Sequence, residues 1–161
     1  MRFLDLIHLF TMSSLRIFTK RETTMAHWLV KSEPKKWSWD DQVKAGKAGT
    51  YWDGVRNHSA KLNMMAMKKG DQAFFYHSNE GKAVVGIVKV IKEYYPDHTD
   101  ASGRFGMVDF QVVRPFKTPV TLDMIKGESA LADMVLVNNS RLSVQPVKDD
   151  EWETVCRMGG L

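Results

Sequence analysis

Three runs rich in valine, isoleucine, phenylalanine and tyrosine lie close together in the middle of this chain, and they restrict its fold more than any other feature. The runs cover Gln72–His77, Ala83–Glu93 and Met107–Phe116, and Gly, Asn, Asp or Pro residues bound them. Runs of this composition between turn residues predict β-strands and hairpins. Because the strands do not alternate regularly with helices, the pattern excludes the parallel sheets of Rossmann and TIM-barrel folds.

The flanking segments predict further short elements. We expect strands at His27–Lys31, stopped by Pro34, and at Leu142–Gln145, closed by Pro146, because proline lacks the amide hydrogen that a sheet uses. Helices are predicted at Ser38–Ala45 with a capping box of Ser38 and Asp41, at His58–Lys68 with Asn57 as its cap, at Thr121–Lys126, at Ala130–Met134 and at Lys148–Met158.

Two finer expectations concern the segment between the first strand and the three central runs. Lys47–Asn57 shows no clear periodicity and is predicted to be an ordered loop. In the helix that follows, Leu62 and Met65 are expected to face the core, with Met64 and Ala66 beside them. All elements together predict an α+β fold, with a curved, mostly antiparallel, barrel-like sheet decorated with short α-helices.

The size and charge of the chain are those of one ordinary domain with a modest basic bias. Its 161 residues include 23 Lys and Arg and 19 Asp and Glu, which gives a net charge of +4. This excess is compatible with a polyanionic partner, although a nucleic-acid surface would need local clustering of the cations. No apolar run is long enough to cross a bilayer, so no membrane partner is predicted.

Residues 1–24 are interpreted separately from the rest of the chain. Their apolar stretch is interrupted by Asp5 and His8 and lacks a convincing small-residue cleavage site, which disfavours a secretory signal. We interpret residues 1–24 as an N-terminal extension, disordered or produced by an upstream start codon, and residues 25–161 as the domain. A docked helix that uses Leu4, Ile7 and Phe10 is the alternative.

The histidines and the single cysteine form no recognisable metal or catalytic motif. The histidines are His8, His27, His58, His77 and His98, and one cysteine cannot complete a zinc site of several cysteines. Cys156 is expected to be a small buried residue of the terminal helix. Asp53 and Glu33 could act as an acid–base pair, or either could act with His77, but loop carboxylates are more often caps or ion-pair partners. We therefore predict no cofactor, no metal and no enzymatic activity.

Aromatic residues stand beside short polar side chains in three segments. These are Lys31–Pro34 together with Trp37, then Tyr51–Asn57, then Tyr76–Asn79. A planar nucleobase needs both ingredients, because aromatic faces stack it at roughly 1–3 kcal/mol per base and polar groups read its edge. The cations placed to hold flanking phosphates are Lys31, Lys35, Lys36, Arg56, Lys61, Lys68 and Lys69. The structural alternative is that Trp52 fills a barrel end and Arg56 pairs with Asp53.

The same segments resemble the EVE domain family. The resemblance rests on five motifs in order, which are Ala26–Pro34 (AHWLVKSEP), Tyr51–Asn57 (YWDGVRN), Gly70–Ser78 (GDQAFFYHS), Ala130–Met134 (ALADM) and Arg141–Val147 (RLSVQPV). It extends from about Met25 to Met158 and leaves out residues 1–24. Five motifs in one order are much more specific than any single pattern.

This resemblance implies a PUA-like fold, as in PUA, ASCH and YTH domains, with a pocket that faces a basic surface. The pocket residues it implies are Ser32, Trp37, Trp52, Val55, Asn57, Tyr76, His77, Ser78, Leu142, Ser143 and Gln145. The phosphate or rim contacts it implies are Lys31, Lys35, Arg56, Lys61 and Arg141. The alternative for His77 is a strand-end histidine satisfied by its neighbours. For Leu142–Gln145 it is a closing strand whose glutamine tethers a loop.

Family members are linked to modified bases, chiefly modified cytosines in DNA, while sister families bind RNA. The hypothesis is therefore a monomeric, non-enzymatic module that holds a modified nucleobase in an aromatic pocket. Its alternatives are a modified base in RNA, an enzyme acting on a nucleotide-like small molecule, and a protein-interaction module with a vestigial pocket. An intracellular location is expected, in the cytoplasm of a bacterium or the nucleus of a eukaryote.

Overall fold

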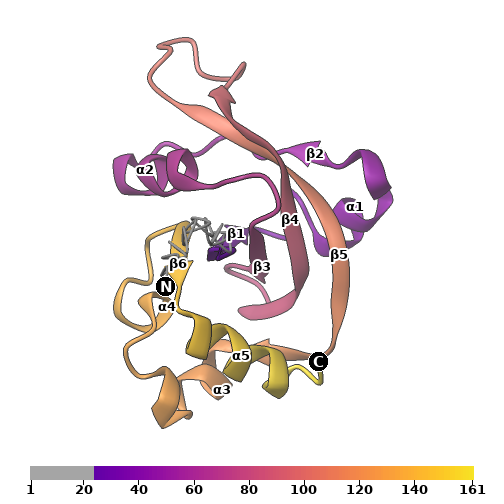
Figure 1. The fold of residues 1–161 in the computed structure, drawn as a ribbon, viewed down its shortest axis with the longest axis vertical. Helices are drawn as coiled ribbons and strands as arrows, with labels where there is room; N and C mark the ends of the chain where they lie inside the picture. The colour runs from indigo at the N-terminus through magenta and orange to yellow at the C-terminus, as the bar shows by residue number, and fades with distance from the viewer. Residues whose placement is uncertain (1–23) are drawn as a thin grey trace, which may run out of the picture.

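The computed structural model describes residues 24–161, and the prediction of an N-terminal extension lies outside the described residues. These residues form one six-stranded mixed sheet with short helices around it (Figure 1). The strands are β1 His27–Ser32, β2 Thr50–Tyr51, β3 Gln72–His77, β4 Ala83–Pro96, β5 Gly106–Thr121 and β6 Val144–Val147. They lie in the order β2-β5-β4-β3-β1-β6. Only the β1–β3 pair is parallel among these neighbours.

The predicted α+β class with a mostly antiparallel sheet is therefore confirmed. The strand pairing does not show the predicted barrel closure. The two edge strands, β2 and β6, are not paired with each other in residues 24–161. Figure 1 shows the long β4–β5 hairpin projecting beyond the rest of the sheet, while α3, α4 and α5 gather at the opposite end.

The helices are short. They are α1 Trp39–Lys44, α2 His58–Ala66, α3 Leu122–Lys126, α4 Val135–Asn138 and α5 Asp149–Met158, with 3-10 turns at Gly46–Ala48 and Ser129–Leu131. The predicted capping box is present, because Asp41 N donates to Ser38 Oγ at 3.1 Å and Ser38 N donates to the Asp41 carboxylate at 2.9 Å. Asn57 Oδ1 likewise accepts from Ala60 N at 2.9 Å. These caps set where α1 and α2 begin, on either side of β2.

Two strand predictions need correction. Thr50 and Tyr51 pair with β5 and form β2, within the segment that was expected to be only a loop. The last strand covers Val144–Val147, not Leu142–Gln145, and Pro146 lies inside it. Pro146 is tolerated there because β6 is an edge strand, where one amide direction needs no partner.

The predicted inward face of α2 is also wrong in part. Leu62 and Met65 are 52% and 47% exposed, and Ala66 is exposed too. Met64 is fully buried as expected, and Ala60, which was not predicted to face inward, is fully buried too. These two residues are four apart, so they share one helical face, and the asparagine cap orients that face toward the sheet.

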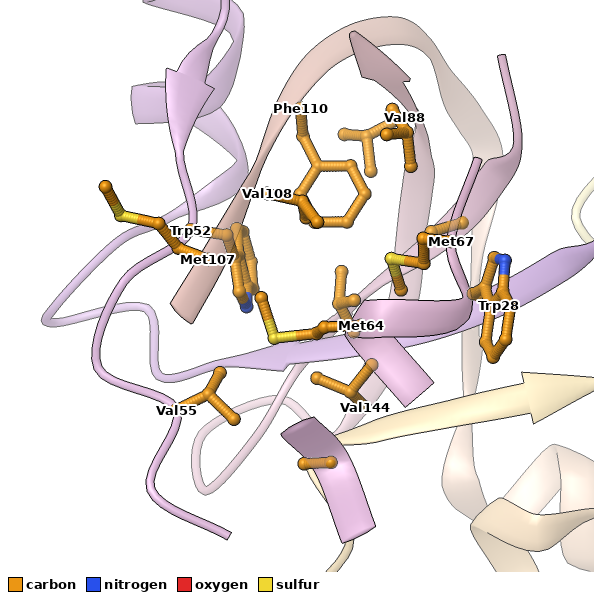
Figure 2. Close-up of a cluster of buried hydrophobic side chains, with 14 of the residues drawn as sticks. Trp28, Trp52, Val55, Met64, Met67, Val88, Met107, Val108, Phe110 and Val144 are labelled. Atoms are coloured by element: carbon orange, nitrogen blue, oxygen red, sulfur yellow. The ribbon is translucent and has the colours of Figure 1, made fainter. Parts of the chain in front are cut away.

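Successive residues along a strand point alternately into two hydrophobic cores, one on each face of the sheet. Trp28 and Val30 of β1 point into one core, and Leu29 between them points into the other. This alternation is the normal consequence of the pleat. Figure 2 shows the first core, in which the Trp52 ring lies in the same buried cluster as Met64 and Phe110.

Helix α1 packs on the sheet through one tryptophan placed over one glycine. The Trp39 ring contacts Phe75 edge to face, with ring centroids 5.4 Å apart. A Cβ atom at Gly86 of β4 would lie 2.3 Å from the Trp39 ring. Only a glycine at position 86 therefore lets α1 approach this closely.

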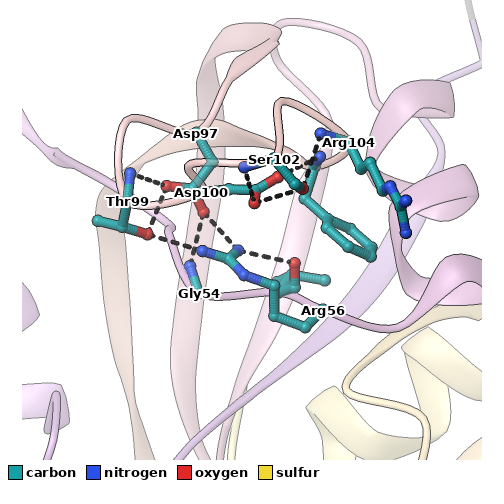
Figure 3. Close-up of polar contacts among 9 residues, drawn as sticks. Gly54, Arg56, Asp97, Thr99, Asp100, Ser102 and Arg104 are labelled. Carbon is teal, nitrogen blue, oxygen red and sulfur yellow. Dashed lines mark hydrogen bonds and ion pairs between the residues drawn. The ribbon is translucent and has the colours of Figure 1, made fainter.

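The tip of the β4–β5 hairpin is joined to the loop between β2 and α2 by a buried carboxylate (Figure 3). Asp97 accepts hydrogen bonds from Gly54 N at 2.9 Å and from Arg56 Nη1 at 2.8 Å. It also accepts from the main-chain nitrogen and the hydroxyl of Thr99, at 2.7 and 2.6 Å. Burial opposes ionisation of this carboxyl, but these hydrogen bonds outweigh it and hold the pKa of Asp97 well below its usual range.

We predict that Gly86→Ala lowers the free energy of unfolding by about 1–3 kcal/mol, because the new methyl group overlaps the Trp39 ring. Urea unfolding followed by circular dichroism measures the change. The matched control is Gly127→Ala, where a Cβ atom would meet only ordinary contacts from 3.4 Å outward. Equal stability of the two variants would contradict the packing described for α1.

We predict that Asp97→Asn lowers the free energy of unfolding at pH 7 by about 2 kcal/mol, the scale of a hydrogen bond to a buried charge. A carboxyl with a depressed pKa stabilises the fold above its unfolded pKa of about 4, and this contribution is lost as the pH falls toward the folded pKa. The difference between wild type and variant should therefore shrink below about pH 4. Asp53→Asn, an exposed carboxylate in the β2–α2 loop that Asp97 contacts, is the control; a pH-independent difference would refute the ionic account.

Candidate functional site

A cavity of about 750 Å³ opens between β1, β2 and the loops that follow them. Its walls come from four segments that are distant in sequence. The lining residues are Lys31, Ser32, Glu33, Lys36, Trp37, Thr50, Tyr51, Trp52, Asp53, Gly54, Val55, Arg56, Asn57, Ser78, Ser140, Arg141 and Ser143. We call this the large cavity, and its volume falls within the range of small-ligand sites.

Three aromatic side chains contribute to the large cavity, and they differ in how much surface they offer. Trp52 is only 7% exposed, because its ring sits edge to face against Phe75 and Phe110 at centroid distances of 5.5 and 5.4 Å. Trp37 is half-buried and its Nε1 donates to Gln42 Oε1 at 2.9 Å, which fixes the plane of the indole. Tyr51 is 47% exposed. Trp37 and Tyr51 thus present more free ring surface than Trp52.

Short polar side chains surround these rings. The Ser32 hydroxyl donates to Trp37 O at 2.6 Å and ties the loop after β1 to the end of that strand. Ser78 N donates to Ser32 O at 2.9 Å, which brings the end of β3 to the same wall. Asn57 caps α2 through its oxygen, so its amide NH₂ remains available as a donor at the cavity. The cavity therefore combines ring faces with hydrogen-bonding groups.

The charge on the lining is mainly positive. Four cations, Lys31, Lys36, Arg56 and Arg141, face two carboxylates, Glu33 and Asp53. Lys36 pairs with Glu33 at 3.7 Å, and Arg56 pairs with Asp97 outside the lining. The alternative pairing of Arg56 with Asp53 is not the one found. The hydrogen bond with Asp97 raises the pKa of Arg56, so this guanidinium stays charged while it holds the loop.

Lys31 is the cation set most deeply in the site. Its ammonium donates to Ser140 O at 2.6 Å, and its main-chain nitrogen donates to Ser143 O at 3.0 Å. Burial lowers the pKa of Lys31. Within residues 24–161 no carboxylate lies within ion-pair distance of this amine. It is a partly desolvated charge that contacts the Ser140 carbonyl oxygen and lies 5.7 Å from the centroid of the Tyr76 ring, and a charge without a carboxylate partner favours an incoming anion.

Of the predicted site residues, the large cavity brings together ten. They are Ser32, Trp37, Trp52, Val55, Asn57, Ser78 and Ser143 from the predicted pocket and Lys31, Arg56 and Arg141 from the predicted rim. The lining also includes residues outside that prediction, which are Glu33, Lys36, Thr50, Tyr51, Asp53, Gly54 and Ser140. Tyr51 directly precedes Trp52 in the motif Tyr51–Asn57, so its position in the sequence could have indicated that it lines the cavity. No sequence motif indicated Ser140, because it reaches the cavity through the path of the loop between α4 and β6.

His77 and Tyr76 lie outside the lining of the large cavity, contrary to the expectation for them. His77 Nε2 accepts from Trp39 N at 3.1 Å and so caps α1 from the end of β3. Burial lowers the pKa of His77, although nearby Asp40 opposes this, and the neutral ring suits an acceptor. Tyr76 is almost fully buried in the second core. Tyr76 and His77 are consecutive residues of β3, so the pleat points their side chains to opposite faces of the sheet. A sequence motif does not indicate which face each side chain occupies.

Leu142, Gln145, Lys35 and Lys61 also lie outside the lining. Leu142 belongs to the first core, and buried Gln145 donates through Nε2 to the carbonyl oxygens of Asn139 and Leu142, at 3.2 and 2.8 Å. Gln145 thereby tethers the loop that carries Ser140, Arg141 and Ser143. Exposed Lys35 pairs with Glu80 at 2.9 Å, and Lys61 lies over the Phe105 ring.

Candidate metal ligands, the predicted acid–base residues and the single cysteine can each be located in the part of the chain that the structure describes. Residues 24–161 hold no group of three or more His, Cys, Asp or Glu side chains placed to bind a metal ion. Asp53 and Glu33 reach the large cavity, but His77 does not. Burial raises the pKa of the Cys156 thiol, which disfavours a thiolate nucleophile. No helix in these residues has the length and apolar character to span a bilayer.

Known proteins resemble this chain closely in sequence and structure. A protein from Rhodopseudomonas palustris solved by NMR is 63% identical, with a TM-score of 0.80 over 84% of this chain and 94% of its own. Human THYN1 protein, solved in complex with 5-methylcytosine-containing DNA, is 36% identical, with a TM-score of 0.79 over 84% of this chain and 98% of its own. Chicken thymocyte nuclear protein 1 is 40% identical over 82% of this chain and 68% of its own length.

A more distant likeness concerns the fold alone. The YTH domain of Zygosaccharomyces rouxii MRB1 is 14% identical, with a TM-score of 0.54 over 85% of this chain. The two chains therefore share an overall fold. The EVE domain model matches residues 26–158, which include all of the sheet and the large cavity. The chain therefore belongs to the EVE domain family.

Proposed function

We propose that this protein binds nucleic acid by holding one modified base, 5-methylcytosine in DNA, in the large cavity. The observation that carries the proposal is the composition of the cavity, in which fixed aromatic rings, hydrogen-bonding side chains and an excess of cations face the same space. The human relative solved with 5-methylcytosine-containing DNA supports the choice of base. A base that leaves its stack needs ring faces, edge partners and a basic rim together.

The geometry favours Trp37 and Tyr51 as the stacking surfaces, because both expose more of their rings than Trp52 does. Trp52 and Val55 supply a buried apolar wall that suits a methyl group. A methyl group in such a wall contributes about 1–3 kcal/mol of discrimination. Binding is proposed without a catalytic step, so the ligand leaves unchanged.

The test is a titration of fluorescently labelled oligomers that carry cytosine or 5-methylcytosine, in single- and double-stranded DNA and in RNA. We expect tighter binding of the methylated DNA, by about 1–3 kcal/mol. Trp37→Leu should weaken this binding by roughly 1–3 kcal/mol, since it removes a stacking face. Trp37→Phe is the matched control: it also loses the hydrogen bond to Gln42 but keeps a ring, and should retain most of the affinity.

Equal, salt-sensitive binding of all oligomers, unchanged by Trp37→Leu, would falsify the proposal and indicate contact with the nucleic-acid backbone alone. Preference for the methylated RNA would retain the cavity and change its nucleic acid. Equal losses in Trp37→Leu and Trp37→Phe would assign the effect to the Gln42 contact instead of stacking.

A further inference from the structure

A second, smaller cavity of about 200 Å³ adjoins the large cavity. The two share three lining residues, Lys31, Ser78 and Ser140. The remaining lining of the small cavity is Tyr76, Asn79, Lys82, Leu122 and Leu136. A ligand that occupied both cavities would therefore pass the Lys31 ammonium.

The small cavity has the charge of an anion site. Two lysines, Lys31 and Lys82, line it, and no acidic residue does within the described residues. Two acidic residues, Glu80 and Asp123, directly follow lining residues in sequence, and Glu80 is engaged by Lys35 at 2.9 Å. Asp123 acts on Tyr76 from outside the lining. Serine hydroxyls and the Asn79 amide add hydrogen-bond donors beside the two cations.

The turn that carries Lys82 is held in an unusual conformation. Asn79 and Lys82 have φ angles of 64° and 38°, in the left-handed region that residues with a side chain rarely adopt. The ends of the turn are fixed, because Ser78 N donates to Ser32 O at 2.9 Å and Leu122 N donates to Lys82 O at 2.8 Å. These bonds hold Lys82 at the edge of the small cavity despite its strained backbone, and strain of this kind clusters at binding sites.

We propose that the small cavity binds the backbone phosphate next to the nucleotide whose base occupies the large cavity. This inference rests on the proposed function. Its volume of about 200 Å³ suits a compact anion better than a second base, because among the described residues a single aromatic side chain, Tyr76, lines it beside two lysines. An ammonium group is a compact point charge that suits a phosphate oxygen, and phosphate contacts fix the register of the chain.

The experiment compares wild type, Lys82→Gln and Lys47→Gln. Lys47 is exposed and lines neither cavity, so its variant controls for the loss of one charge. The ligands are 5-methyldeoxycytidine without phosphate, its 3′- and 5′-monophosphates, and a trinucleotide with 5-methylcytosine at its centre, each titrated at several salt concentrations by calorimetry. Thermal unfolding of each variant confirms that it is folded.

We expect Lys82→Gln to bind the trinucleotide several-fold more weakly and to lower the slope of log affinity against log salt by about 1, while nucleoside binding stays unchanged. Lys47→Gln should match wild type. Identical trinucleotide affinity and salt slope in all three proteins would overturn the phosphate site and leave the base pocket intact. If no ligand binds the wild type, the proposed function itself fails, and this inference fails with it.

Discussion

The buried Asp97 carboxylate is the contact on which the large cavity depends. It joins the tip of the β4–β5 hairpin to Gly54 and Arg56, and those residues belong to the loop that carries Trp52, Val55 and Asn57. A loop of this length has no secondary structure to hold it, and its glycine adopts a φ of 78°. The loop is ordered because a carboxylate 43 residues from Gly54 satisfies its donors. The hairpin tip does not line the large cavity. It supports the cavity wall indirectly, because it holds the loop that forms part of that wall.

These contacts give Arg56 a structural role in addition to the predicted phosphate contact. A loop arginine beside aromatic residues is a natural candidate for phosphate contact, and the sequence pattern predicted that role. In the structure its guanidinium also donates to Thr99 Oγ1 at 2.9 Å and to Val55 O at 3.0 Å. Its guanidinium therefore donates mainly to groups that hold the loop and the hairpin tip together. Among the cations that line the large cavity, Lys31 is the least exposed, and no carboxylate of residues 24–161 pairs with it.

The fold was more predictable from sequence than the site, for identifiable reasons. Composition and turn residues located β1, β3, β4 and β5, and caps such as Ser38 and Asn57 located the helices, because these signals act over a few residues. Which side of a strand a residue occupies depends on register, and this is why His77 was placed in the pocket when it caps α1. Likewise Leu62 and Met65 look apolar and inward by type, but the orientation of α2 buries Met64. Long-range contacts such as Asp97 with Gly54 leave no local pattern at all.

The weak overall charge explains why the position of a few cations matters more than their number. With a net charge of +4, the chain exerts little long-range attraction on a nucleic acid, so affinity has to come from short-range contacts. Lys31 is suited to this because it is partly desolvated, held by Ser140 O, and common to both cavities. Under the proposed function, a nucleotide that filled both cavities would pass the Lys31 side chain. Under the proposed function, base and backbone recognition are therefore coupled through one wall, and a binder with a modest basic surface gains selectivity for a nucleotide that fills both cavities.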